Sequence, residues 1–367
     1  MTEQPTLAIG LMSGTSLDGM DAALVRFRGP THAELIGFVH LPYTRDYRRR
    51  LTDAIHLGTT RELALLHVSL SDWAVEAISE LLAKTHTKAS SVDFIAFPGQ
   101  TIWHEPPAVT WQLGEPAILA EAFGTRVVSN FRPRDVAAGG QGAPLVPIAD
   151  VLLFGADHPR VLLNLGGMAN LTYVVRRAVE AGAIAFDTGP GVAVIDEVAR
   201  LVDPSLPYDV DGRLAATGQP NETALADLLA DPFFAGAPPK STGREHFGLD
   251  YALRLHERVP GPDGVATAVE LTARSIATAI SRWVPDATEV VASGGGLHHP
   301  GLVARLAVRL GSDRAFRAFD QLFFSGDAKE AVAFALLGYL TIHGQPGNMI
   351  AATGARGPRV LGAVTPA

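Results

Sequence analysis

The sequence predicts a soluble, glycine-rich α/β protein built from two similar halves. The chain has 367 residues, of which 47% are hydrophobic and 19% charged. That is enough apolar material to bury a core, and it excludes a disordered or fibrous chain. A strand, a Gly-rich turn and a second strand open the chain at Thr6 and recur at Val161. This recurrence fits a duplicated α/β domain with a ligand between the halves.

The first half begins with apolar, β-rich runs separated by turn residues, which predict an antiparallel meander. These runs are Thr6–Met12, Met20–Phe27 and Glu34–Leu41. Leucines and other apolar residues then recur at three- and four-residue spacing from Arg61 to about Lys84, which predicts a long helix. Two short buried strands follow, at Val92–Phe97 and Arg126–Ser129.

The second half repeats this plan. A hairpin is predicted from Val161–Leu165 and Asn170–Val175, joined through Gly166 and Gly167. The remaining predicted elements are, in order, a strand at Ala183–Phe186, a helix from about Val192 to Leu201, a helix from about Val265 to Val284, a strand at Glu289–Ala292, and a last long helix from near Asp327.

Composition excludes several classes of function. The 30 Lys+Arg residues against 38 Asp+Glu give a formal charge of −8, the wrong sign for a nucleic-acid binder. No basic block follows an apolar span, and the run Ala331–Leu340 is too short to cross a bilayer, so no membrane partner is expected. The absence of cysteine excludes a disulfide scaffold, a thiol nucleophile and a Cys-ligated metal. The N-terminus lacks a signal-peptide pattern, so we expect a cytoplasmic protein.

The strongest local motif is the run Gly10–Asp21, which holds small residues, hydroxyls and carboxylates. Small residues let backbone N–H groups approach a phosphate, and Ser or Thr hydroxyls add donors. The acidic residues could orient a phosphate-bound Mg²⁺ or a water. Asp18-Gly19 taken alone fits an ordinary hairpin turn, but we favour a phosphate loop. The standard P-loop and G-x-G-x-x-G motifs are both missing, so a nucleotide site must have another architecture.

Two strand-end motifs in the second half could carry chemistry. Asp187 follows a predicted strand beside a Gly-rich turn, where α/β folds place reactive groups and a carboxylate can take a proton. A helix N-cap or Asx-turn explains the same residue equally well. The run Ser293–Gly296 suits close packing against a flat ligand or phosphate, but it is also a simple flexible turn.

Three further sites offer polar contacts. Glu330 could hydrogen-bond a substrate, although Asp327 and Glu330 have the spacing of a capping box. Arg134, near Arg132, could grip a carboxylate or phosphate, or one of these arginines could pair with Asp135. The segment Gly99–His104 offers an amide, a hydroxyl and an indole face of the kind that contacts sugars, while a lone histidine there is more often structural.

Taken in order, these motifs resemble the anhydro-N-acetylmuramic acid kinase family over essentially the whole chain. The matching runs are Gly10–Asp21, Gly99–Thr101, Phe131–Asp135, Gly139–Pro147, Asn164–Asn170, Phe186–Gly191, Pro238–Glu245, Ser293–Gly296 and Asp327–Ala331.

The resemblance implies two duplicated actin-like (ribonuclease H-like) α/β domains with a ligand cleft between them. We expect an N-terminal domain at 1–129, possibly joined by the tail near 345–367, and a C-terminal domain at 130–344. The implied reaction uses ATP, Mg²⁺ and water to open the 1,6-anhydro bridge of anhydro-N-acetylmuramic acid and to phosphorylate the 6-oxygen. The products are N-acetylmuramic acid 6-phosphate and ADP, within peptidoglycan recycling. The resemblance also implies a homodimer.

The resemblance assigns roles residue by residue. By its position in the family pattern, Asp187 resembles the general base that activates water. The residues implied to bind the nucleotide are Gly14, Thr15, Ser16, Leu17, Asp18, Gly19, Met20, Asp21, Asn164, Gly166, Gly167, Gly189, Gly191, Gly294, Gly295 and Gly296. The residues implied to contact the sugar are Gln100, Thr101, Arg134 and Glu330. The resemblance assigns no particular residue as a metal ligand.

This chain departs from the family pattern at three positions. Pro98 replaces the usual His, Asn130 the usual Asp, and Val192 the usual Asn. These changes leave two alternatives open: a kinase of the same fold that acts on an ordinary hydroxyl of another amino sugar, and a non-catalytic sugar or nucleotide sensor. The retained Asp187 argues against a sensor.

Overall fold

The computed structural model describes residues 4–14 and 16–367, and it divides the chain into two compact units. Unit 1 comprises Met1–Leu153 and Ala328–Ala367, and unit 2 comprises Phe154–Asp327. The domain boundaries expected from the sequence lay after residue 129 and after residue 344. The difference arises because the helix α13 (Lys329–Ile342) packs on strands β1, β2 and β4 of unit 1, which no local pattern reveals.

Unit 1 contains a six-stranded mixed sheet with the order β13-β7-β4-β1-β2-β3. Its strands are β1 Thr6–Met12, β2 Gly19–Phe27, β3 Ala33–Pro42, β4 Phe94–Phe97, β7 Val127–Ser129 and β13 Ala363–Thr365. The first three strands form the predicted antiparallel meander, and β4 and β7 run parallel to β1. A separate two-stranded ribbon, β5 Gln100–Glu105 and β6 Val109–Leu113, was not predicted.

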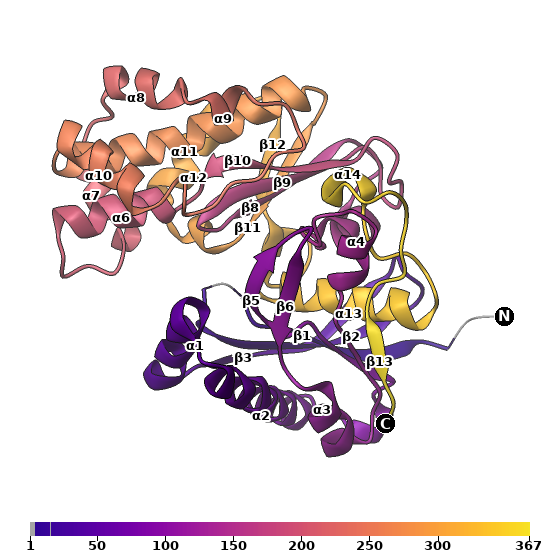
Figure 1. Ribbon diagram of the computed structural model, residues 1–367. Helices are drawn as coiled ribbons and strands as arrows, with labels where there is room; N and C mark the ends of the chain where they lie inside the picture. Colours follow the sequence, from indigo (N-terminus) through magenta and orange to yellow (C-terminus); the bar gives the residue numbers. More distant parts are fainter. Residues whose placement is uncertain (1–3, 15) are drawn as a thin grey trace. The chain divides into compact units, whose positions relative to one another are not determined.

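Helices cover both faces of this sheet (Figure 1). Helix α2 places its buried side chains against β2 and β3, and Thr59 caps its N-terminus by accepting from the Glu62 N–H. On the opposite face α13 approaches β1 so closely that a Cβ at Gly10 would overlap the Ala331 carbonyl. The helices of unit 1 are α1 Arg45–Leu57, α2 Thr60–Lys84, η1 Ala89–Ser91, α3 Pro116–Phe123, α4 Pro133–Ala137, α5 Pro147–Ala149, α13 and α14 Ile350–Thr353. A π-helical segment, η2 Asp150–Phe154, leads out of the unit.

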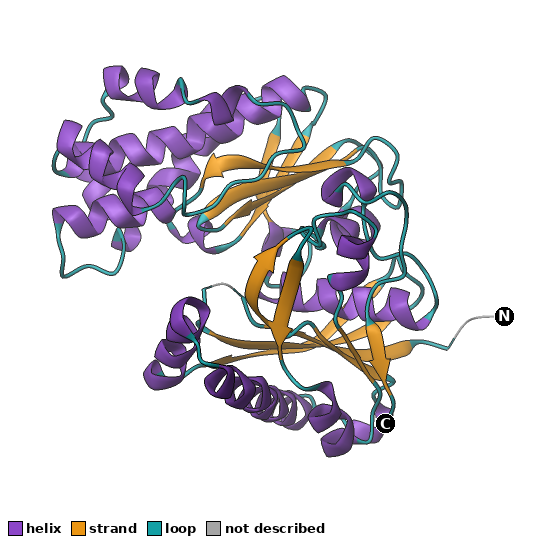
Figure 2. Cartoon of the chain, viewed as in Figure 1, coloured by secondary structure: helices purple, strands orange, loops and turns teal. Residues whose placement is uncertain are grey.

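Unit 2 contains a five-stranded sheet with the order β10-β9-β8-β11-β12. Its strands are β8 Arg160–Leu165, β9 Met168–Val174, β10 Ile184–Pro190, β11 Glu289–Ser293 and β12 Ala315–Ala318. Figure 2 shows the helices packed beside these strands. They are α6 Ala193–Val202, η3 Val210–Gly212, α7 Arg213–Thr217, α8 Glu222–Leu229, α9 Pro232–Ala235, α10 Leu249–Arg258, α11 Pro262–Trp283, η4 Gly295–His298, α12 Pro300–Leu310, η5 Phe319–Gln321 and, at the exit from the unit, η6 Gly326–Ala328.

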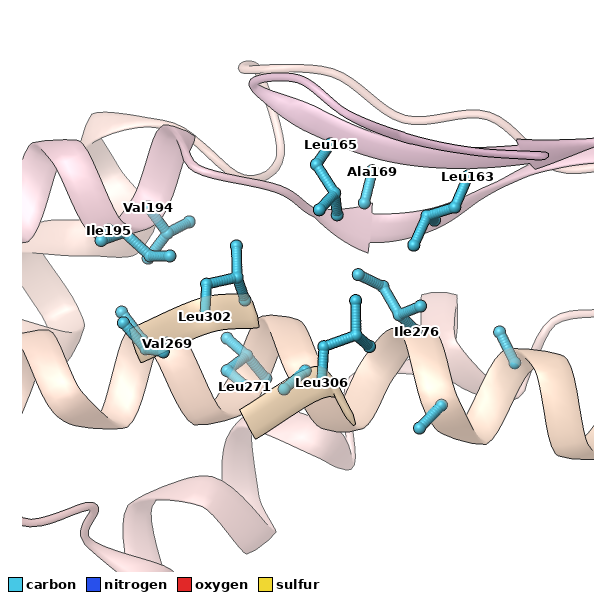
Figure 3. Close-up of a cluster of buried hydrophobic side chains, with 14 of the residues drawn as sticks. Leu163, Leu165, Ala169, Val194, Ile195, Val269, Leu271, Ile276, Leu302 and Leu306 are labelled. Atoms are coloured by element: carbon cyan, nitrogen blue, oxygen red, sulfur yellow. The ribbon is translucent and has the colours of Figure 1, made fainter. Parts of the chain in front are cut away.

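The core of unit 2 lies between its sheet and the long helix α11. Figure 3 shows Leu163 and Leu165 of β8 pointing toward Ile276 of α11 and toward Leu302 and Leu306 of α12. Each of these side chains is fully buried. Burying one leucine or isoleucine contributes about 1.5–3 kcal/mol, so this layer holds the strand ends of unit 2 in place.

The two sheets share one topology. In each, the first strand pairs antiparallel with the second, the second antiparallel with the third, and the first parallel with the fourth, whose other neighbour is a parallel fifth strand. This 3-2-1-4-5 order confirms the predicted duplication and the ribonuclease H-like class. Across residues 4–14 and 16–367, none of the helices has the length and apolar character needed to cross a bilayer.

Candidate active site

The turn between β1 and β2 of unit 1 is held by its own polar groups. The Leu17 N–H donates to the Gly14 carbonyl (3.2 Å), and the Ser16 Oγ donates to the Asp18 Oδ1 (2.7 Å). Arg48 of α1 donates from Nη2 to the Ser16 carbonyl at 3.0 Å. Ser16 and Asp18 are exposed, so their polar atoms can meet a ligand. Thr15, also predicted for this site, lies outside the described residues.

The rest of the predicted phosphate loop belongs to strand β2. A Cβ at Gly19 would lie 2.5 Å from the Leu41 carbonyl of β3, so this glycine is required by strand packing. Met20 is fully buried, and the Asp21 Oδ1 lies 2.7 Å from the His40 Nδ1. The predicted run 14–21 therefore combines a turn, in which Ser16 and Asp18 are exposed, with a packed strand.

A buried hydrogen-bond network connects this turn to the β5–β6 ribbon. The Ser13 Oγ donates to the Gln100 Oε1 at 2.6 Å, and it lies 2.7 Å from the Tyr43 hydroxyl. Gln100 and Ser13 are both buried, and burial raises the pKa of Tyr43. The network satisfies the Gln100 carbonyl, so this predicted sugar contact is also a structural residue. Thr101, the next residue of β5, is half-buried.

Glu330 lies in the first turn of α13, among charged groups from its own helix and from two other segments of unit 1. The residue is solvent-accessible, yet protein crowded around its carboxyl raises its pKa. Lys329 and Arg132 oppose that rise, while Asp21 and Asp18 add to it. Arg132 is therefore near enough for its charge to act on Glu330, whereas the side chain of Arg134, the predicted contact, is exposed and makes no hydrogen bond or ion pair to any described residue.

Asp187 lies within β10 of unit 2, and not at the end of a strand as predicted. The strand continues to Pro190 through an irregularity after Asp187, which pairs with Asn170 of β9. The Thr242 N–H donates to the Asp187 Oδ2 at 2.8 Å, and the Asp187 N–H donates to the Lys240 carbonyl at 2.9 Å. Burial raises the pKa of Asp187 to about 6, although the Thr242 N–H lowers it. The Asp187 carboxylate is therefore held in one orientation, and its pKa lies close to neutral pH, as a general base requires.

The glycines of unit 2 surround the turn of the β8–β9 hairpin. The Gly167 carbonyl accepts from the N–H groups of Gly191 and Ala193, and the Gly166 carbonyl accepts from Val192. A Cβ at Gly191 would overlap the Gly166 carbonyl. The start of α6 is thus fixed directly on this turn.

The strand-end glycines after β11 meet the same hairpin. A Cβ at Gly294 would lie 2.7 Å from the Asn164 Oδ1, and one at Gly296 would lie 2.8 Å from the Leu165 Cβ. A Cβ at Gly295 would meet no described heavy atom within 4 Å. On β10, a Cβ at Gly189 would lie 2.6 Å from the Phe234 ring. Close packing therefore accounts for the glycines at 189, 294 and 296. At Gly295 the space beside the backbone is open.

Sequence reasoning assigned no role to several residues that shape these sites. Lys240 and Thr242 hold Asp187 through their backbones, so a side-chain pattern could not find them. Arg132 stood beside the predicted Arg134, and the sequence offered no way to choose between them. By contrast, Asp196 of α6 is half-buried with a pKa that burial also raises to about 6, but its side chain makes no hydrogen bond to the described residues of these sites. Among the described residues, no group of three or more His, Asp or Glu side chains could hold a metal ion.

Residues 6–367 match the family described as anhydro-N-acetylmuramic acid kinase. A protein of that name from Gloeobacter violaceus is 42% identical over 381 residues and is covered over 99% of each chain. Another, from Caldanaerobacter subterraneus, is 39% identical over 387 residues, covering 99% of this chain and 98% of the relative. A ROK hexokinase from Thermus thermophilus is similar with a TM-score of 0.41 at 16% identity, covering 92% of this chain and 100% of that one.

Proposed function

The chain belongs to the anhydro-N-acetylmuramic acid kinase family, and on this premise we propose that it opens the 1,6-anhydro bridge of anhydro-N-acetylmuramic acid and phosphorylates the freed 6-oxygen. The substrates are the anhydro sugar, ATP and water, and the products are N-acetylmuramic acid 6-phosphate and ADP. The proposal rests most directly on Asp187, a carboxylate oriented by the Thr242 N–H with a pKa of about 6.

In the proposed mechanism Asp187 takes a proton from the attacking water. The Thr242 N–H occupies Oδ2, and no described residue hydrogen-bonds to Oδ1, which is left to accept that proton. The water oxygen bonds to the anomeric carbon, and the bond from that carbon to the 6-oxygen breaks. The electron pair stays on the 6-oxygen, which attacks the γ-phosphorus, and ADP leaves. Phosphoryl transfer itself needs positioning and charge neutralisation more than covalent help.

For the nucleotide, we propose contacts from both glycine-rich turns. In unit 1 the exposed backbone and hydroxyl of the turn at Gly14, Ser16 and Asp18 suit phosphate oxygens. In unit 2 the open position at Gly295 favours direct contact with the nucleotide, whereas Gly189 and Gly191 support it through packing. Mg²⁺ would be carried on the ATP phosphates, the usual arrangement for this ion, and would neutralise phosphate charge. We assign no residue as its ligand.

For the sugar, we propose contacts from Gln100, Thr101, Glu330 and an arginine of the 132–134 segment. Of the two arginines, Arg132 lies toward Glu330, which favours it as the residue that acts with this carboxylate. Arg134 keeps its predicted role as a substrate contact, because its side chain is exposed and uncommitted to any described residue.

Two of the three departures from the family pattern, Val192 and Asn130, have backbone conformations or contacts that are compatible with an active enzyme. Val192 keeps the backbone N–H that binds the Gly166 carbonyl, which does not depend on its side chain. Asn130 adopts a left-handed φ of 54°, a conformation that asparagine tolerates. We also propose a homodimer in the cytoplasm, on the family resemblance, and light scattering at several concentrations tests the assembly.

One assay separates this function from its alternatives. The protein is incubated with Mg-ATP and anhydro-N-acetylmuramic acid in ¹⁸O water, and the masses of the products are measured by mass spectrometry. The proposed reaction yields a 6-phosphate with one heavy oxygen at the anomeric carbon. Phosphorylation of an ordinary hydroxyl would introduce no heavy oxygen, and a sensor would bind without turnover.

A further inference from the structure

One short segment of unit 2, residues 240–245, contacts both the proposed base and the glycine turn of the β8–β9 hairpin. The Lys240 carbonyl accepts from the Asp187 N–H at 2.9 Å, and the Thr242 N–H donates to the Asp187 Oδ2 at 2.8 Å. Farther along the segment, Arg244 reaches the hairpin turn, where a Cβ at Gly167 would lie 3.5 Å from the Arg244 Nη2 and 3.9 Å from its Nε. The stretch of chain that orients the carboxylate therefore also places a guanidinium beside the turn.

The Arg244 guanidinium is almost uncommitted within the part of the chain that the structure describes. Its side chain is 67% exposed and makes no hydrogen bond to residues 4–14 or 16–367. The Arg244 Nη1 lies 3.8 Å from the Glu197 Oε1, but that oxygen is already only 2.6 Å from the Arg200 Nη2. A guanidinium has five N–H donors in a planar fork, so Arg244 is free to bind a further anion.

Other arginines of unit 2 are used differently. The side chains of Arg274, Arg305 and Arg309 all hydrogen-bond to the buried Glu270 carboxylate, and they join α11 to α12 in this way. Arg244 holds no such buried partner among the described residues, and it lies against a turn whose carbonyls already accept from the first N–H groups of α6. Packing therefore explains the three arginines of the helix pair, and it leaves the position of Arg244 unexplained.

We propose that Arg244 binds the phosphate chain of ATP at the β8–β9 turn. Phosphoryl transfer needs charge neutralisation, and backbone N–H groups carry no net charge. The chain also lacks the P-loop motif, whose lysine would supply a cation. A guanidinium can donate to two phosphate oxygens at once, which fixes the orientation of the phosphate as well as its charge. The inference rests on the proposed function for the identity of the nucleotide, but its test needs no sugar.

The test measures nucleotide binding by calorimetry in a buffer that contains Mg²⁺. Arg244→Ala should weaken the binding of ADP roughly 10-fold, because a charge-assisted hydrogen bond is lost. The same variant should bind adenosine as the wild type does, since adenosine has no phosphate. Arg244→Lys keeps the charge without the fork and should recover part of the loss. Unchanged ADP affinity in Arg244→Ala, or equal losses for ADP and adenosine, would overturn the inference.

A second variant separates phosphate binding from a structural role of Arg244. If Arg244 only anchored its segment to α6 through Glu197, then Glu197→Gln and Arg244→Ala would weaken ADP binding alike, and this result would also overturn the inference. If Arg244 binds phosphate, Glu197→Gln removes a competing anion and should leave ADP affinity equal or higher. Arg244→Gln, which keeps a long polar side chain without the charge, should match Arg244→Ala.

The matched control is Arg213→Ala. Arg213 is another exposed arginine of unit 2, and its Nη2 lies 2.9 Å from the Asp211 Oδ2. Arg213→Ala should bind ADP like the wild type, because its guanidinium lies 2.9 Å from its own carboxylate partner. A loss as large as that of Arg244→Ala would mean that any removed surface charge weakens binding, and the assignment to Arg244 would then be wrong.

Product formation decides the proposed function separately. A protein that binds ADP with the expected dependence on Arg244 but never phosphorylates anhydro-N-acetylmuramic acid refutes the proposed reaction and supports the inference. A protein that phosphorylates the sugar, but whose Arg244→Ala variant binds ADP like the wild type, overturns the inference alone.

Discussion

The two units have the same sheet topology, but side chains make the main hydrogen bonds in the loops of unit 1, whereas backbone groups make them in unit 2. In unit 1 the loops at the strand ends are held together by side chains, as in the Ser13–Gln100–Tyr43 network. In unit 2 they are filled by backbone, with the carbonyls of Gly166 and Gly167 accepting the first N–H groups of α6. Unit 2 also carries Asp187, a carboxylate that is oriented by the Thr242 N–H.

This difference shows how one duplicated fold can supply two kinds of recognition. Side chains offer varied hydrogen-bonding groups, which suits a sugar with several distinct hydroxyls. Backbone N–H groups offer uniform donors at close range, which suits phosphate oxygens. The topology sets where the strands end, and the residues at those ends set what each unit can bind.

The largest expected effect tests whether the chemistry of unit 2 depends on one carboxylate. Asp187→Asn should reduce turnover at least about 100-fold, because the amide cannot take a proton from water. Its carbonyl oxygen can still accept from the Thr242 N–H, so nucleotide binding should persist. The matched control is Asp196→Asn, a half-buried aspartate of the same unit whose pKa is also raised to about 6. Equal losses in the two variants would contradict the assignment.

The backbone character of unit 2 is tested at consecutive glycines. Gly294→Ala should lower the free energy of unfolding by about 2 kcal/mol, because φ is +93° and a Cβ would approach the Asn164 amide. Gly295→Ala should leave the urea midpoint almost unchanged, since its Cβ meets no described atom within 4 Å, but it should raise KM for ATP. An unchanged KM in a stable Gly295→Ala protein would argue against nucleotide contact there.

The side-chain character of unit 1 is tested at Ser13. Ser13→Ala leaves the Gln100 carbonyl and the Tyr43 hydroxyl without this partner, which should cost about 1–2 kcal/mol in urea unfolding. Ser79→Ala serves as the control, because the Ser79 hydroxyl is exposed and bonds to a carbonyl of its own helix. If both serine variants have the same stability, the buried network adds little to unit 1.

The smallest expected effect is a pH dependence of stability that the titration of Asp187 causes. Its folded pKa of about 6 lies above the ordinary value of 3.8, so folding disfavours its ionised form. The stability it contributes is complete below pH 4 and is lost as pH rises through 6. The stability that Asp187→Asn gains over the wild type should therefore be larger at pH 8 than at pH 5, by about 1 kcal/mol. Thermal melts at both values provide the measurement, and a gain independent of pH would contradict it.

Among the described residues, the sequence predicted most of the strands but only four of the helices, which are α2, α6, α11 and α13. Strand β1 was predicted with its observed bounds, and α2 within one residue at its start, because periodic apolar residues report which face of an element is buried. The β5–β6 ribbon carries exposed Trp103 and Trp111 and lacks a clear apolar face, so its pattern was not read as strands. The end of β10 was misplaced because Gly189 and Pro190, which usually mark turns, continue the strand.

By itself the sequence determined the α/β class, the duplication and the family, because periodicity and ordered motifs are properties of neighbouring residues. Only the tertiary structure decided that α13 returns to unit 1, that the charge of Arg132 acts on Glu330, and that Thr242 orients Asp187. It also revealed a buried ion pair between Asp150 and Lys329. Such pairings join residues far apart in the chain, and burial makes their charges and hydrogen bonds strong. Neither the partner nor the burial of a side chain can be read from its own position in the sequence.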